Sequence, residues 1–572
     1  MRLNGLVSVL TAGALLVTAC SGSAGEADDS TQRTRPVDAV GALEWTSCED
    51  DVGVVDTECA TLQVPLDHGD PDGAAIDIAI ARVVAGEPAR RIGSLVFNPG
   101  GPGGSGVEFL TQAALLMPSE IAARFDLVGF DPRGVGASTA VVCDVPIDDS
   151  TVLLDEGDDA AYAAMVEQQA EDLAACTDAS LDLAPFLGTN HAARDLDRLR
   201  AALGDDALSY VGYSYGTRLG ATYAELFPDN VRALVLDAAV KPTTDLLELD
   251  LGQAEGFDRA LRNFAEACDA DTDCLLQELG PTLDVIADLR REIADVESFP
   301  TDDGARILTP GELDLGIIAA LYSKDAWPFL AQALSTAEVD QDGTLLQVLG
   351  DGLAGRRADG TYDNSGVANT FINCADVTDR PDLEQVRSDA EQAAAGSEFF
   401  GDLLRGSTGC LGVPPTDEAL TIGSAAAAAP ILVLGNTGDP ATPYEWSVEL
   451  ADVLESAVLY TVEAEGHTAF GTIACVTETV VDYLVELAVP APGASCSDNA
   501  TADFFVPAGE SEVEQIVSLF ACLRENGADV PEFTIADVLA DPTGEELFDA
   551  LDVSDPALLD AAAECQDLLP QL

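Results

Sequence analysis

Histidine is scarce in this chain. Only His68, His191 and His467 occur among 572 residues. Cys-x-x-Cys, a frequent spacing of paired metal ligands, is absent as well. Because structural and catalytic zinc sites are built mainly from histidine and cysteine, both absences argue against a zinc protein. We expect neither a metal nor another cofactor.

Basic residues are also few. Lysine and arginine together number 26, against 102 aspartates and glutamates, and the formal net charge is −76. A surface of this sign repels phosphate backbones, so we expect no nucleic-acid partner. It would attract cationic peptides. A hydrated acidic surface suits high salt, although a lineage-wide preference for Asp and Glu explains the composition equally well.

The chain contains no apolar run long enough for a permanent membrane helix near its start. Residues 6–17 are apolar and follow Arg2, which is typical of a secretory signal. Residues 17–20, Val-Thr-Ala-Cys, resemble a bacterial lipoprotein box, with cleavage before Cys20 and lipid on its sulfur. An ordinary export signal is the alternative. We expect a signal peptide at 1–19, a tether at 20–40, and a protein that is lipid-anchored outside the cell membrane or secreted.

Cysteine usage agrees with an oxidising exterior. Of thirteen cysteines, removal of Cys20 leaves an even set of twelve. They fall into neighbouring couples, and each bridge would add ~2–4 kcal/mol. The expected couples are Cys48/Cys59, Cys143/Cys176, Cys268/Cys274, Cys374/Cys410, Cys475/Cys496 and Cys522/Cys565.

A strand, a sharp turn and a helix are expected at residues 208–227. The apolar run 208–211 meets Gly-Tyr-Ser-Tyr-Gly at 212–216, and helical spacing continues to Pro228. Such a turn exposes the Ser214 hydroxyl at the positive end of a helix. Gly212 and Gly216 would be required because a Cβ there would collide with the neighbouring strand and helix. The motif alone is equally compatible with a plain Gly/Ser loop.

A serine nucleophile needs a base, and hydrolases built on this turn carry Ser, then Asp or Glu, then His along the chain. Only His467 follows Ser214. Asp439 lies in a loop (436–440) after the apolar strand 430–435, and His467 follows a second strand, 457–462. Both would emerge at strand ends, where open α/β sheets place their chemistry. We predict Asp439 as the acid, with Asp237, after strand 234–236, as the alternative.

A glycine-rich loop at residues 98–106 follows the apolar segment 95–98. Backbone N–H groups aimed at a developing oxyanion contribute ~3–4 kcal/mol each. We predict donors at Gly101, or else Gly100, and at Tyr215. A phosphate-binding loop is the alternative, but no Lys-Ser/Thr follows and no Gly-x-Gly-x-x-Gly opens a helix.

These motifs occur in one order: Asn-Pro-Gly-Gly-Pro-Gly-Gly-Ser-Gly (98–106), Phe-Asp-Pro-Arg-Gly-Val-Gly (130–136), Gly-Tyr-Ser-Tyr-Gly-Thr (212–217), Asp-Pro-Ala-Thr-Pro (439–443) and Gly-His (466–467). Over residues 45–496 the chain resembles the secreted tripeptidyl aminopeptidase branch of the proline-iminopeptidase-like serine hydrolases. The resemblance implies peptide substrates whose free amino terminus is held by acidic residues of a cap. Two departures, His68 in place of a Tyr and Cys410-Leu-Gly-Val-Pro in place of a Trp-Pro after the cap cysteine, leave the peptide preference open.

The expected architecture is an α/β-hydrolase fold, a mostly parallel sheet flanked by helices, with a helical cap insertion and a small helical C-terminal module. We place the core at 41–239 and 416–500, the cap at 240–415 and the module at 501–572. An edge hairpin (59–66, 76–83), strands 95–98 and 127–131, cap helices 313–322 and 329–334, and module helices 512–526 and 556–569 are expected within these parts.

Four further polar residues are interpreted as structural. Asp131 and Arg133 are expected to pair and to brace the glycine-rich loop, His191 to cap or pack a helix, and His68 to lie in a turn. The sequence therefore predicts a monomeric, extracytoplasmic serine exopeptidase that contacts the membrane only through its lipid. A carboxylesterase using the same triad and an inactive lipid-anchored binding protein are the alternatives.

Overall fold

A computed structural model describes residues 35–36, 43–48, 56–143 and 159–498 (apart from 181, 244, 297–298, 302–305, 358–359, 379, 406–408 and 417), together with 504, 522–524 and 530. The expected signal peptide, Cys20, most of the tether, and nearly all of the C-terminal module, including Cys565, lie outside the described residues. In the described part, no helix is both long and apolar enough to cross a bilayer.

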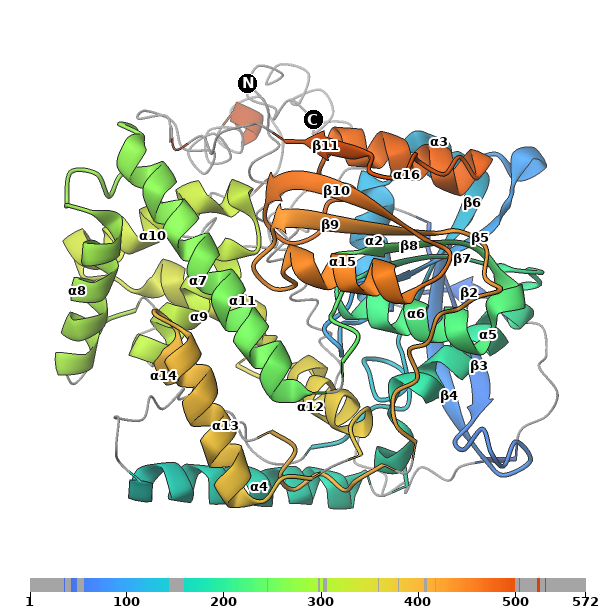
Figure 1. The fold of residues 1–572 in the computed structure, drawn as a ribbon, viewed down its shortest axis with the longest axis horizontal. Coiled ribbons are helices and arrows are strands. Elements are labelled where there is room, and N and C mark those ends of the chain that lie inside the picture. Colours follow the sequence, from blue (N-terminus) through green and yellow to red (C-terminus); the bar gives the residue numbers. More distant parts are fainter. Residues whose placement is uncertain are drawn as a thin grey trace.

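An eleven-stranded sheet runs through the larger part of the molecule, in the order β11-β10-β9-β8-β7-β5-β6-β4-β3-β2, with β1 beside β4 (Figure 1). The strands from β11 to β6 are parallel, and β4, β3, β2 and β1 join antiparallel at one edge. The strands are β1 Arg35–Pro36, β2 Thr46–Ser47, β3 Glu58–Pro65, β4 Ala74–Val83, β5 Gly93–Asn98, β6 Phe125–Phe130, β7 Leu208–Tyr213, β8 Val231–Asp237, β9 Ile431–Gly438, β10 Ala457–Glu465 and β11 Ser495–Ser497.

Helices cover both faces of this sheet, and successive strand residues alternate between the two cores. On β5, Val96 packs with residues of α5, α6 and α15, whereas Leu95 and Phe97 pack with α2, α3 and α16. Since side chains alternate along a strand, such apolar runs require a sheet buried on both sides. The predicted α/β-hydrolase architecture is therefore confirmed. These helices are α2 Gly106–Leu116, α3 Ser119–Arg124, α5 Thr189–Leu203, α6 Tyr215–Leu226, α15 Tyr444–Val453 and α16 Ala474–Glu486.

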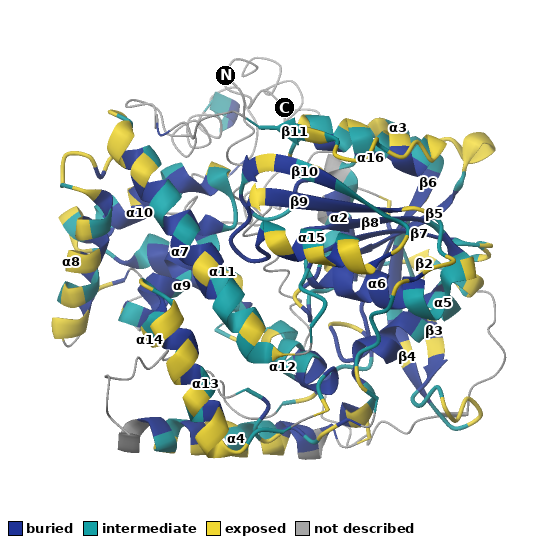
Figure 2. Ribbon diagram, in the orientation of Figure 1, coloured by how far each residue is buried: buried dark blue, intermediate teal, exposed yellow. Residues whose placement is uncertain are grey.

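A helical cap is inserted between β8 and β9 and has a core of its own, which includes Phe264, Trp327 and Leu334. Figure 2 shows the buried faces of its helices turned toward one another. Its helices are α7 Leu246–Ala270, α8 Thr282–Asp295, α9 Pro310–Leu321, α10 Trp327–Asp340, α11 Thr344–Ala354, α12 Ser365–Ala375, α13 Leu383–Gly396 and α14 Gly401–Leu404.

The cap layer also receives a helix from the first half of the chain. Helix α4 (Asp159–Ala179) lies beside α13, where Tyr162 and Val166 bury their side chains against Ala390 (Figure 1). Tyr162 and Val166 therefore pack against the cap and not against the sheet.

Two strands that carry site residues are longer than predicted. The expected ends were residues 435 and 462, but β9 continues to Gly438 and β10 to Glu465. Glu465 is paired with Gly438 after an irregularity in the ladder. Pairing with a neighbouring strand therefore outweighs the weak strand propensity of Gly435, Asn436 and Gly438.

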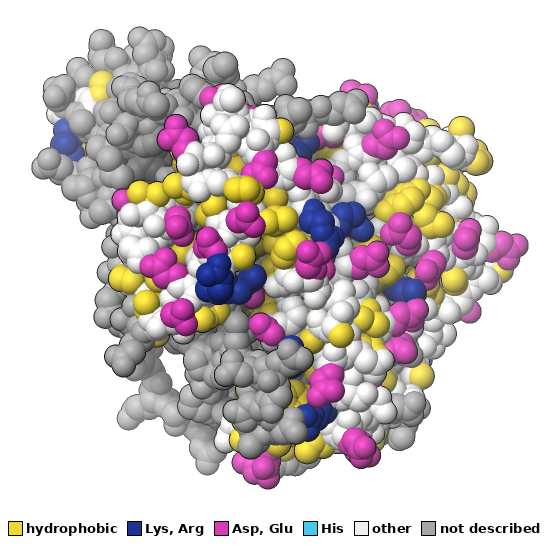
Figure 3. All heavy atoms as spheres, turned by 60° about the vertical axis from the view of Figure 1, so that its left-hand side comes forward, with side chains coloured by type: hydrophobic (Ala, Val, Ile, Leu, Met, Phe, Trp, Pro, Cys, Tyr) yellow, Lys and Arg dark blue, Asp and Glu magenta, His cyan; other side chains and the backbone are white. Residues whose placement is uncertain are grey.

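Among the described residues, five disulfides join the neighbouring couples Cys48–Cys59, Cys143–Cys176, Cys268–Cys274, Cys374–Cys410 and Cys475–Cys496. Acidic side chains are spread over the face shown in Figure 3, with few basic groups between them. Both lysines are engaged in ion pairs, Lys241 with Glu248 at 2.7 Å and Lys324 with Asp498 at 2.8 Å.

Candidate active site

Ser214 occupies the turn between β7 and α6 in a backbone conformation that L-residues rarely adopt, with φ 53° and ψ −121°. A Cβ at Gly212 would lie 2.3 Å from the Gly216 carbonyl oxygen, and one at Gly216 would lie 2.8 Å from that of Asn98. The glycines are thus needed for the close approach predicted from the sequence. The strained turn holds the serine at the C-terminal end of the central strand.

His467 and Asp439 meet at the ends of β10 and β9. The imidazole Nδ1 lies 2.9 and 3.0 Å from the two carboxylate oxygens of Asp439, which is completely buried. The carboxylate also accepts the N–H groups of Ala441 and Thr442 at 3.0 and 2.8 Å, and the Thr442 hydroxyl at 3.1 Å. With Nδ1 donating to the carboxylate, Nε2 is left as the nitrogen that can accept a proton.

Two opposing effects act on the pKa of His467. Burial alone would lower it, but the Asp439 carboxylate favours the imidazolium, and the net effect raises the pKa above its ordinary value of 6.5. A base with this environment holds a transferred proton more readily than a free imidazole. The pair is therefore suited to general base catalysis near neutral pH.

Asp237, the alternative acid, binds main-chain N–H groups instead of the imidazole. Its carboxylate accepts the N–H groups of Ala469 and Phe470, at 3.0 and 2.8 Å, and so holds the chain that follows His467. Burial raises the pKa of Asp237 to about 6 despite these two bonds. The structure thus brings Asp439, and not Asp237, into hydrogen-bonding contact with the imidazole.

The histidine loop is held at further points that sequence reasoning missed. The Asn436 amide donates to the carbonyls of Gly466 and Thr468, at 3.0 and 2.8 Å, and the N–H of His467 donates to the Tyr322 carbonyl at 2.8 Å. The Tyr322 ring meets the imidazole edge to face, with centroids 5.4 Å apart. Asn436 directly follows a predicted strand and lies three residues before Asp439, so it could have been suspected. Nothing local to Tyr322 indicates its contact.

The glycine-rich loop lies directly against the turn that carries Ser214. A Cβ at Gly100 would lie 2.9 Å from the Ser214 Cβ and 3.2 Å from the Tyr215 nitrogen, and φ at Gly100 is +102°. The N–H of Gly100 itself donates to the Asn98 side chain at 3.1 Å. Since that donor is occupied, Gly101 is left as the candidate oxyanion donor of this loop, beside the Tyr215 amide.

Asp131 and Arg133 do not pair with each other as expected. Asp131 accepts the Ser105 hydroxyl at 2.7 Å and the Val107 N–H at 3.1 Å, so it does brace the start of α2 behind the glycine-rich loop. Arg133 instead forms a bidentate pair with Asp195, with both distances 2.7 Å. Its remaining donors are taken by the carbonyls of Pro65, Leu66 and Phe186. The fork geometry of arginine is thereby fully used away from Asp131.

The other two histidines belong to this buried cluster. His68 lies 2.8 Å from Asp195, and His191, near the start of α5, is 7% exposed. Burial, followed by the charge of Arg133, lowers the pKa of His191 to about 4. His191 is thus a packed histidine and His68 lies in a turn, as the sequence predicted for each.

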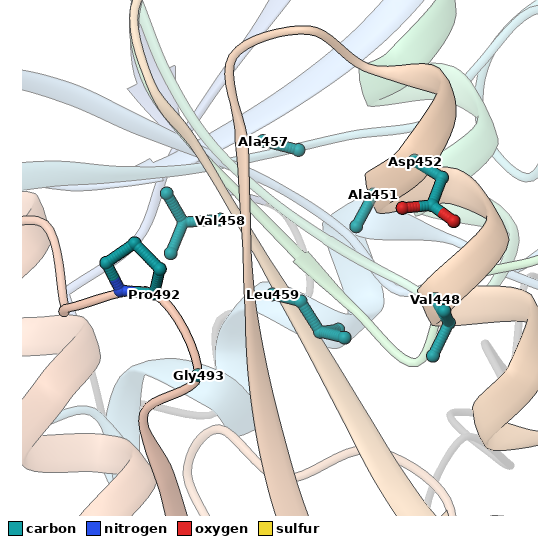
Figure 4. Close-up of a pocket in the computed structure, with 8 residues that line it drawn as sticks. All are labelled: Val448, Ala451, Asp452, Ala457, Val458, Leu459, Pro492 and Gly493. Atoms are coloured by element: carbon teal, nitrogen blue, oxygen red, sulfur yellow. The ribbon is translucent and has the colours of Figure 1, made fainter.

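A surface groove away from Ser214, Asp439 and His467 has none of these residues in its lining. This groove of about 240 Å³ lies between α15 and β10 and is lined by small and apolar side chains, with Asp452 as its charged residue (Figure 4). It contains neither a nucleophile nor a base. Among the described residues, no cluster of three or more His, Cys, Asp or Glu side chains has the geometry to hold a metal ion.

Comparison with known proteins agrees with this geometry. Residues 93–279 match a family described as alpha/beta hydrolase fold, and residues 397–496 match one described as TAP-like protein. Serine protease Hip1 of Mycobacterium tuberculosis is 37% identical over 476 residues, which cover 79% of this chain and 91% of that protein. Carboxylesterase B of the same species is 35% identical over 475 residues, with 79% and 89% covered.

Tripeptidyl aminopeptidase of Streptomyces lividans is 29% identical over 483 residues, which cover 80% of this chain and 87% of that protein. The matched segments include the nucleophile turn and both loops at the ends of β9 and β10. The chain belongs to the TAP-like serine hydrolases, peptidases of the α/β-hydrolase fold.

Proposed function

We propose that this protein removes short peptides, three residues long, from the free amino termini of peptide substrates outside the cytoplasm. The contact between the His467 imidazole and the buried Asp439 carboxylate, just beyond the ends of β10 and β9 in the sheet that also contains the Ser214 strand β7, is the observation that carries the proposal. The name of the Streptomyces relative supports the tripeptide length.

In the proposed reaction, Ser214 Oγ attacks the scissile carbonyl carbon while His467 Nε2 takes the hydroxyl proton. The amides of Gly101 and Tyr215 stabilise the oxyanion. The C–N bond then breaks, the imidazolium donates its proton to the leaving amine, and an acyl-enzyme remains. Water, deprotonated by the same imidazole, hydrolyses this ester, releases the short peptide and restores the serine.

The cap explains why such an enzyme would act on chain ends. A Cβ at Gly103 would lie 2.4 Å from the Ser365 carbonyl oxygen, so helix α12 of the cap touches the glycine-rich loop itself. A cap seated on the rim of the site limits the length of chain beyond Ser214. Carboxylates of the cap would then hold the free α-ammonium group, and the acidic surface would attract it.

The test compares free and N-acetylated forms of one chromogenic tripeptide amide, alongside a simple aryl ester. Acetylation removes the cation and leaves a buried acid unpaired, at a cost of ~2–4 kcal/mol, or about 30- to 1000-fold in kcat/KM. Raised salt should leave most of this discrimination, because close buried pairs are screened least. Equal rates on both amides would contradict the exopeptidase proposal.

A carboxylesterase is the second candidate, because one relative carries that name and the same triad cleaves esters. Ester turnover far above both amides, without discrimination by acetylation, would favour it.

Location is tested separately: we propose export and a lipid on Cys20, so Cys20→Ala should move the protein from the membrane fraction to the medium. Unchanged fractionation would contradict the anchor and leave the enzymatic proposal unaffected.

A further inference from the structure

Helix α7 of the cap presents one row of residues to the segment that carries Asp439. Gln253 Nε2 donates to the carbonyl oxygen of Ala441 at 3.0 Å, and Arg259 Nη2 donates to that of Asp439 at 2.7 Å. Residues three apart lie on one face of a helix, so these two side chains and Gly256 between them form a single row. The row therefore directly faces the loop that carries Asp439, which we call the acid loop.

At the centre of the row, the backbone of the helix itself meets the loop. A Cβ at Gly256 would lie 2.1 Å from the Pro440 carbonyl oxygen, a distance that no side chain can occupy. Together the three positions cover the consecutive carbonyls of residues 439, 440 and 441.

One turn further along α7, the same face reaches the strand that precedes His467. Asn263 Nδ2 donates to Glu465 Oε1 at 3.0 Å, and Glu465 Oε2 lies 2.6 Å from where a Cβ of Gly438 would be. Arg259 Nε and Glu465 Oε2 are both buried, and neither has a hydrogen-bond partner among the described residues. The side chains of Arg259 and Glu465, which carry opposite charges, thus lie beside the end of β9, immediately before Asp439.

The Asp439 segment needs such external support. The N–H groups that hold its carboxylate come from Ala441 and Thr442, which belong to the same loop and would move with it. The ladder between β9 and β10 ends at Gly438. Beyond that point, α7 supplies contacts from outside the loop that fix its main chain.

We propose that Arg259, with Gln253 and Gly256, positions the catalytic acid, so that the cap is part of the catalytic apparatus as well as a filter for substrates. The inference rests on the proposed role of Asp439. It implies that α7 cannot swing away as a free lid without carrying the acid out of line with the imidazole. A displacement of this kind by about 1 Å lowers rates by up to ~100-fold.

The first experiment replaces Arg259 by methionine, which keeps an unbranched apolar stem and removes the charge and the donors. We expect kcat to fall about 10- to 100-fold, with little change in KM. The acid limb of the kcat profile should move to lower pH, because a misplaced carboxylate no longer raises the pKa of His467 fully. The matched control is Arg262→Met on the same helix, since Arg262 is 42% exposed and pairs with Glu398 at the surface.

The second experiment is Gly256→Ala, which should push α7 and the acid loop apart and lower kcat at least as much. Its control, Gly366→Ala on α12, has nothing within 4 Å of the added Cβ. Rates are expressed per folded molecule, determined by circular dichroism and size-exclusion chromatography. Gln253→Ala serves in place of any variant that does not fold, with the same expected direction of change.

Unchanged kcat and an unchanged pH profile in Arg259→Met, Gly256→Ala and Gln253→Ala would overturn the inference. The parallel variant Asp439→Asn separates the two levels of the proposal. If Asp439→Asn is inactive while the α7 variants retain full activity, the positioning role is wrong and the triad stands. If Asp439→Asn retains activity, the assignment of the acid is itself wrong.

Discussion

Replacing each of the two buried aspartates by asparagine separates the catalytic acid from the structural one. Asp439 contacts His467 Nδ1, so Asp439→Asn should present the wrong hydrogen-bonding group to the imidazole and lower kcat by ~10⁴. In Asp237→Asn, the amide oxygen can still accept the N–H groups of Ala469 and Phe470, which converge mainly on one carboxylate oxygen at 3.0 and 2.8 Å. Its kcat should therefore fall by less than ~10-fold, in contrast with the ~10⁴ loss at the triad.

The folding stability of Asp237→Asn should not fall together with its activity. The pKa of Asp237 is raised from 3.8 to about 6 by burial, so the folded protein binds this proton more tightly than the unfolded chain. Stability from this group is therefore present at low pH and is lost as the pH rises from about 4 to 6. The difference corresponds to at most ~3 kcal/mol. Since asparagine mimics the neutral carboxyl, Asp237→Asn should be no less stable than wild type at pH 7.

Both effects are measured with one chromogenic tripeptide amide and with thermal unfolding at pH 4.5 and 7. The reasoning would be refuted if Asp237→Asn lost more activity than Asp439→Asn, because the acid would then be on β8. A lower Tm of Asp237→Asn at pH 7 than at pH 4.5, each relative to wild type, would refute the linkage argument alone.

Three further outcomes are expected. Gly100→Ala forces a side chain into φ +102° and within 2.9 Å of the Ser214 Cβ. This clash should displace the loop and with it the N–H of Gly101, so kcat should fall by ~10²–10³, the effect of losing one oxyanion donor; activity within a few-fold of wild type would contradict the placement of the loop. Arg133→Met removes the bidentate partner of the buried Asp195 carboxylate, which keeps only its contact with His68, and breaking a buried pair of this kind should destabilise the fold by ~3–5 kcal/mol. Arg90→Met, in a pair that is about half exposed, should cost ~0–1 kcal/mol by chemical denaturation; equal losses would show that burial does not decide the difference. Because the pKa of His467 is raised and only the neutral imidazole accepts a proton, kcat/KM should rise with pH with its midpoint above 6.5; a midpoint below that value would contradict the assigned environment.

Local patterns predicted the parts of the site that are local. The strand, turn and helix around Ser214 follow from apolar spacing and from two glycines that a close backbone approach requires. The scarcity of histidine indicated His467 as the base. The five described disulfides join neighbours in sequence, so pairing by proximity was sufficient.

Contacts between distant segments could not be predicted in this way. The sequence predicted Asp131 as the partner of Arg133, but the fold brings Asp195, 62 residues away, within 2.7 Å. The row on α7 looks like an ordinary amphipathic helix, because Gln253 and Arg259 are common on exposed faces and their carbonyl partners carry no side-chain signature. Tyr322 acts through its main-chain oxygen, which any residue possesses.

The choice between the two aspartates depended on the register of the sheet, which no local pattern contains. Asp237 ends β8 and is paired with Leu434, four residues before the end of β9 at Gly438. Gly438 in turn is paired with Glu465 at the end of β10. Residues that follow Gly438 and Glu465 therefore leave the sheet at the same height, which brings Asp439 to His467. Asp237 lies further from this end of the sheet. The chain returns past Asp237 after His467, and the N–H groups of that returning chain need an acceptor.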